Sequence, residues 1–71
     1  MKYKLIYIAT KETQLNQLIG KKLNIIQDEN NTYLLFENNK YVKVETKEKE
    51  VLICNLVVLE DSHSLFVLEL I

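Results

Sequence analysis

Alternating apolar and polar residues recur along most of the chain, and this pattern predicts a protein made mainly of β-strands. Residues 3–9 are β-branched and aromatic, with apolar side chains on both alternating sets, as expected of a strand covered on both faces. Residues 41–45 alternate cleanly, so we expect Val42 and Val44 to face the core. The six predicted strands span residues 3–9, 23–27, 32–37, 41–45, 51–59 and 65–71.

One segment follows a helical pattern instead. Leu15, Leu18 and Ile19 are spaced i, i+3, i+4, and Gly20 follows where a helix could end in the left-handed conformation. The spacing predicts a short helix over about residues 11–19. A helix of this length is not stable alone in water, so we expect its apolar stripe to pack on the sheet.

Polar segments between the strands predict turns. Residues 28–31 and 60–63 are rich in Asp, Asn and Ser, which favour turns. Asn38 and Asn39 tolerate the positive φ that a two-residue hairpin turn requires. Residues 46–50 form a run of mixed charges, which we interpret as a solvated connection.

These elements predict one small domain over residues 1–71 of the α+β class, mostly β. We expect a small antiparallel sheet or a partly open barrel of five to six strands, with one short helix after the first strand. The simplest strand order is a meander of sequential hairpins. For 71 residues, burial of apolar surface barely exceeds the conformational entropy lost on folding, so a partner would add useful stability.

Charge and composition disfavour several classes of function. The formal net charge is −1, and all nine basic residues are lysine, which weakens the case for non-specific nucleic-acid binding and for base readout by arginine. No apolar run approaches the roughly 18 residues of a membrane span. A chain rich in Lys, Asn, Ile and Glu is typical of an AT-rich genome. We therefore expect a cytoplasmic protein of a low-GC bacterium, or of a phage or other mobile element resident in one.

Residues with catalytic chemistry are few. Asp61, Ser62 and His63 are adjacent in one turn, whereas a triad is assembled from distant segments. Cys54 and His63 are too few to form a structural zinc site. We expect Cys54 to be a buried, inert thiol within a strand. The sequence thus predicts no enzyme, no metal and no cofactor.

The apolar excess of the last two predicted strands is the most informative feature. In residues 51–59 and 65–71 both strand faces are apolar, and one short helix cannot cover them all. We expect a subunit interface there, with a second copy or another protein. The alternative is a deeply curved barrel that encloses these residues. The candidate oligomer interface consists of Val57, Leu59, Leu65, Val67 and Ile71.

Three functions fit these features. The leading hypothesis is a non-enzymatic protein-interaction module, a small inhibitor or regulator that binds a host protein. The second is a small-barrel nucleic-acid-binding protein, in which lysines contact phosphates and tyrosines stack on bases. The third is a structural assembly subunit of a phage particle. The candidate nucleic-acid face of the second hypothesis consists of Lys21, Lys22, Lys40, Tyr41 and Lys43.

Overall fold

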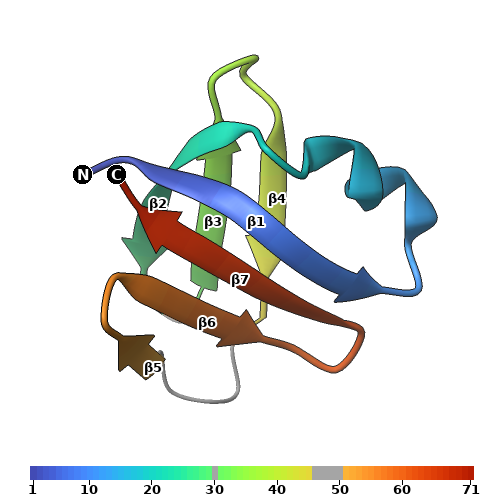
Figure 1. Cartoon of the computed structure of the whole chain (residues 1–71). Helices are drawn as coiled ribbons and strands as arrows, with labels where there is room; N and C mark the ends of the chain where they lie inside the picture. The colour runs from blue at the N-terminus through green and yellow to red at the C-terminus, as the bar shows by residue number, and fades with distance from the viewer. Residues whose placement is uncertain (30, 46–50) are drawn as a thin grey trace.

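A computed structural model describes residues 1–29, 31–45 and 51–71 of the chain as one antiparallel sheet with one short helix (Figure 1). The predicted charge run at residues 46–50 lies outside the described residues. The strands are β1 (Tyr3–Thr10), β2 (Lys22–Asp28), β3 (Asn31–Phe36), β4 (Tyr41–Val44), β5 (Val51–Ile53), β6 (Leu56–Glu60) and β7 (Ser64–Leu70), and the helix η1 is Thr13–Leu18.

The sheet has seven strands in the order β4-β3-β2-β1-β7-β6-β5, with β4 and β5 at its edges. The predicted fold class, a small antiparallel sheet with one helix after the first strand, is confirmed. The predicted meander is interrupted between β4 and β5, which form the two edges of the sheet, while β1 pairs with both β2 and β7. Strands β1 to β4 form one run of antiparallel neighbours and β5 to β7 form another. The pairing of β1 with β7 joins the two runs.

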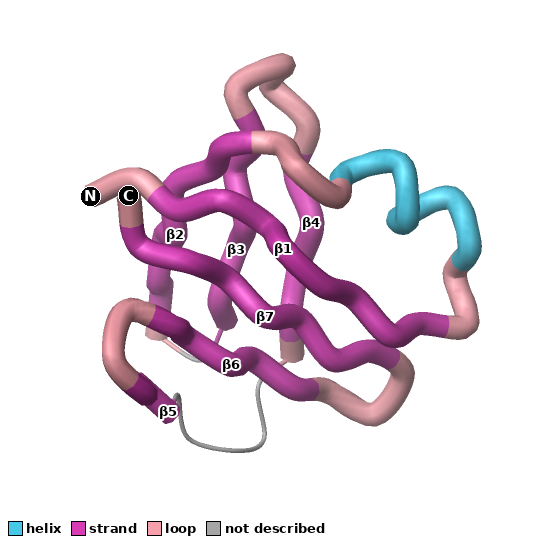
Figure 2. The backbone as a smooth tube through the Cα atoms, viewed as in Figure 1, coloured by secondary structure: helices cyan, strands magenta, loops and turns pink. Residues whose placement is uncertain are grey.

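The sheet folds into two layers because β1 pairs with β2 over a much shorter length than with β7. It pairs with β2 only at Tyr3 and Lys4, but it follows β7 as far as Thr10. Strands β2, β3 and β4 therefore turn away from β1 and lie behind β1, β7 and β6 (Figures 1 and 2). The core fills the space between the layers, and its largest fully buried side chains are Phe36, Phe66, Leu5, Leu23, Leu34, Leu59, Leu68 and Val44.

The helix is attached at the point where β1 and β2 separate. The Gly20 N–H donates to the Leu5 carbonyl at 2.7 Å, and Gly20 has the positive φ, 88°, that its position predicted. The helix is a six-residue 3-10 helix. With three residues per turn, Leu15 and Leu18 lie on one face and are buried, whereas Ile19 points away and is 46% exposed. The prediction that Ile19 belongs to the packed stripe was therefore wrong.

The predicted strand over residues 51–59 is two strands joined by a tight turn. Ile53 pairs with Leu56, so Cys54 and Asn55 form the turn, and Cys54 is exposed with a φ of 58°. The expectation of a buried thiol was wrong. Apolar residues flank the turn on both sides, so the sequence pattern did not predict a turn there. In the β3–β4 hairpin, Asn39 has the expected positive φ, 65°.

Candidate interaction surfaces

The outward-facing residues of β6, β7 and β1 line up in three rows across the sheet. We call them together the apolar face. The middle row joins Val58, Val67 and Tyr7. The other two rows are Glu60, Leu65 and Ala9, and Leu56, Glu69 and Lys4.

Most side chains on the apolar face lack the polarity that an outward position usually has. Antiparallel sheets that are covered on one side normally alternate apolar inward and polar outward residues. Here Val58, Leu65 and Val67 are only half-buried, and Tyr7 is 53% exposed. The inward side chains of β6 and β7 pack in the core between the layers, whereas the described elements closest to their backbones are the neighbouring strands of the sheet.

The five predicted interface residues do not share one surface. Val57 and Leu59 are 5% and 0% exposed and belong to the core, as the enclosed-barrel alternative expected of them, although it also expected Val67 and Ile71 to be enclosed. Leu65 and Val67 lie on the apolar face, and Ile71 is exposed beyond the end of β7. Because side chains alternate between the two faces of a strand, no single interface of an intact sheet can include both sets.

Part of the apolar face comes from β1, whose residues were not among the predicted interface residues. The pairing of β1 with β7 is interrupted between Leu5 and Tyr7 by a β-bulge. Ile6 and Tyr7 are therefore both exposed, while Leu5 and Ile8 on either side are buried. A bulge leaves no signal in the hydrophobic pattern, so these two residues could not be assigned to a surface from the sequence.

A second outward face lies on β2, β3 and β4, on the opposite side of the two layers. We call it the tyrosine–lysine face. Its central rows are Asn24, Leu35 and Tyr41, and Ile26, Tyr33 and Lys43. Tyr41 is 63% exposed and Ile26 is 41% exposed.

The predicted nucleic-acid residues lie on this second face or at its edge. Tyr41 and Lys43 project from β4, and Lys40 immediately precedes that strand. Lys21 and Lys22, at the start of β2, line a hollow of about 310 Å³ together with Glu37 and Asn38. The Glu37 N–H donates to the Lys22 carbonyl at 3.2 Å. The β3–β4 hairpin is therefore held against the start of β2.

The charges around this hollow are mostly positive. Lys2 Nζ lies 2.6 Å from Glu37 Oε1, and both side chains are more than half exposed. The hydrogen bond and charge of Lys2, with a further contribution from the charge of Lys22, lower the pKa of Glu37. Lys4 and Lys22 are direct cross-strand partners. Among the described residues the ion pairs are Lys2–Glu37 and Lys43–Glu45, which leaves four lysines of this region unpaired: Lys4, Lys21, Lys22 and Lys40.

The turn that contains Asp61 and His63 is organised by backbone hydrogen bonds. Asp61 Oδ1 accepts the N–H groups of His63 and Ser64 at 2.8 and 2.7 Å. The Ser64 hydroxyl lies 2.6 Å from that of Thr10. The carboxylate thus caps the turn, and the serine hydroxyl ties β7 to the end of β1. No group of three or more potential metal ligands occurs among the described residues.

No known protein family, curated protein or solved structure matches this chain. No helix within the described ranges is long and apolar enough to cross a membrane. The two outward faces therefore have to be interpreted from their own chemistry.

Proposed function

We propose that this chain is a non-enzymatic protein-interaction module that binds another protein through the apolar face. The observation that carries the proposal is the row of Val58, Val67 and Tyr7, which lies outward on three adjacent strands. The small size and the composition typical of an AT-rich genome support a regulator or inhibitor encoded by a phage or other mobile element, acting on a host protein.

Burial of the apolar face provides the driving force for such binding. Full burial of a Val or Leu side chain is worth about 1.5–3 kcal/mol, and those on this face are already half-buried. Each would therefore gain at most about 1 kcal/mol in a complex. Leu56, Val58, Leu65, Val67 and Tyr7 together supply at most several kcal/mol, which must also offset the entropy lost on association.

Charges at the two ends of the apolar face would orient the partner. Lys4 and Glu69 are neighbours in one outer row, and Glu60 lies in the other. Apolar residues at the centre of an interface with charges at its rim are typical of protein complexes, where the rim contributes more to specificity than to affinity. The partner surface that fits is apolar, with a basic group placed opposite Glu60.

Affinity capture from host lysate, with nuclease present, tests the proposal. Wild type is compared with Val67→Lys and with the matched control Ile26→Lys, which introduces the same charge on the other face. We expect a protein that is retained by wild type and by Ile26→Lys and lost with Val67→Lys. The proposal is wrong if wild type retains no protein, or if Val67→Lys retains it equally well.

The mass of the purified chain separates this proposal from self-assembly. A module that acts on another protein should have the mass of one chain at micromolar concentration. A large homo-oligomer that Val67→Lys dissociates would instead favour the structural assembly subunit.

A further inference from the structure

We infer that the tyrosine–lysine face binds single-stranded nucleic acid. This surface lies on the opposite side of the two layers from the apolar face, and only Lys4, at the rim of the apolar face beside Glu69, adjoins both. The inference therefore does not depend on the proposed protein-binding function. It rests on three features of the described residues: two outward tyrosines, a group of unpaired lysines next to them, and the separation of these lysines from most of the acidic residues.

The two tyrosines can act as stacking platforms for successive bases. Tyr33 is the cross-strand partner of Lys43, and Tyr41 lies two residues before Lys43 on the same strand. Tyr33 and Tyr41 are thus diagonal neighbours on one face, at a separation of roughly 7–8 Å. Neither hydroxyl has a hydrogen-bond partner within the described residues. Sheet surfaces with exposed aromatic residues on adjacent strands bind single strands by stacking, with little dependence on sequence.

The lysines beside the tyrosines form a site for phosphates. Lys21 and Lys22 line the hollow of about 310 Å³, and Lys40 immediately precedes Tyr41. Lys4 is the cross-strand partner of Lys22 on one side and of Glu69 on the other, and like charges directly opposite each other, as in the lysine pair, are destabilising. The carboxylate that lines the hollow, Glu37, is already paired with Lys2.

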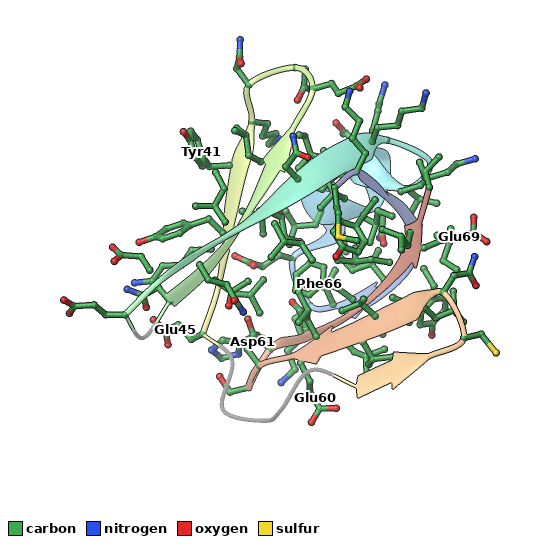
Figure 3. The ribbon with its side chains drawn as sticks, turned by 90° about the vertical axis from the view of Figure 1, so that its left-hand side faces the viewer. Tyr41, Glu45, Glu60, Asp61, Phe66 and Glu69 are labelled. Carbon is green, nitrogen blue, oxygen red and sulfur yellow. The ribbon has the colours of Figure 1, made fainter. Side chains whose placement is uncertain are left out.

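Most of the acidic side chains lie away from this hollow. Strands β2, β4 and β6 all end in or just before acidic residues, whereas the lysines cluster where β1, β2 and β4 begin. Figure 3 shows Glu45, Glu60 and Asp61 in the lower part of the molecule, below Tyr41. Among the described residues, most lysines near Tyr41 lie toward one end of β2 and β4, and most carboxylates lie toward the other end, where Glu45 pairs with Lys43.

Single-stranded nucleic acid fits this surface better than an acidic protein segment does. An acidic peptide would use the lysines but not the tyrosines, whereas a nucleic acid uses both. The face is a sheet surface with no helix or arginine for reading the major groove of a duplex. If three lysines contact phosphates, the logarithm of the affinity should fall with the logarithm of salt with a slope of about −2.

Fluorescence anisotropy with labelled oligo-dT and oligo-U of twelve nucleotides tests the inference. Between 50 and 200 mM salt, a slope of about −2 predicts a loss of affinity of roughly 20-fold. The triple variant Lys21→Gln, Lys22→Gln, Lys40→Gln should bring the slope close to zero, while the control Lys11→Gln should leave it unchanged. Tighter binding of one oligonucleotide would identify the preferred sugar.

The tyrosine variants separate base stacking from simple charge attraction. Tyr41→Ala should weaken binding by roughly 5- to 150-fold, the range for loss of one base stack, without changing the salt slope. The matched control is Tyr7→Ala, which removes a similarly exposed tyrosine from the apolar face and should have no effect. Circular dichroism confirms that each variant is folded.

Three results would overturn the inference. The first is no binding of either oligonucleotide at micromolar protein in 50 mM salt. The second is binding that Tyr41→Ala and Tyr7→Ala weaken equally. The third is equal competition by a poly-glutamate peptide, which would identify the lysines as a site for acidic protein segments.

Discussion

Replacement of Leu18 by alanine tests how the short helix is held in the structure. The six-residue helix has no side-chain cap and no acidic residue in its first turn, so packing of Leu15 and Leu18 must hold it in place. Leu18 is 3% exposed. Removal of a buried leucine side chain costs about 2–5 kcal/mol, depending on how far the cavity collapses. A domain of this length has roughly 4–11 kcal/mol of stability in total.

Urea unfolding followed by circular dichroism or tyrosine fluorescence measures the loss. With an m-value of about 1 kcal/mol/M, a loss of about 3 kcal/mol moves the midpoint by about 3 M. The matched control is Ile19→Ala, the next residue along the chain, which is 46% exposed. It should cost less than about 1 kcal/mol. Equal losses from the two variants would refute the assignment, because they would place Ile19 in the core as an α-helix would.

Three further variants test local features of the fold. Lys2→Met should raise the pKa of Glu37 toward its ordinary value of 4.5, measured by NMR titration. Because the pairing with Lys2 lowers that pKa, its contribution to stability is present above pH 4.5 and is lost as the pH falls through the lowered pKa, where wild type and variant should converge. Cys54→Gly should raise the free energy of unfolding by up to about 1 kcal/mol, because glycine adopts the positive φ of the turn without strain; a decrease would show that this φ is not strained. Gly20→Ala should lower the same quantity by about 1 kcal/mol through its φ of 88°, although the space around its Cα is open, and an unchanged midpoint would contradict that backbone assignment.

The sequence was sufficient to predict the type and approximate position of most elements. Clean alternation over residues 41–45 assigned Val42 and Val44 correctly to the core. Gly20 and Asn39 were recognised as residues able to adopt a positive φ. These features are local, and each depends only on the chemistry of a few adjacent residues.

The remaining features depend on contacts between distant segments. The pairing of β1 with β7 joins the two ends of the chain, and no short-range pattern encodes it. In β6 and β7 both alternating sets are apolar, so the sequence could not show whether Val57 or Val58 faces the core. For the same reason the candidate interface mixed core and surface residues. The convergence of lysines and tyrosines also became visible only once β2, β3 and β4 were aligned in register.

Protection of a thiol at position 67 tests most directly whether the apolar face is a protein-binding surface. In a Cys54→Ser background, Val67→Cys places one thiol on the apolar face and Ile26→Cys places one on the other face. Both should react quickly with a maleimide in the dilute free chain. In the captured complex, the thiol at position 67 should react at least tenfold more slowly, while the thiol at position 26 keeps its rate. Full reactivity at position 67 in the complex would contradict the proposal, because it would leave the apolar face uncovered when the partner is bound.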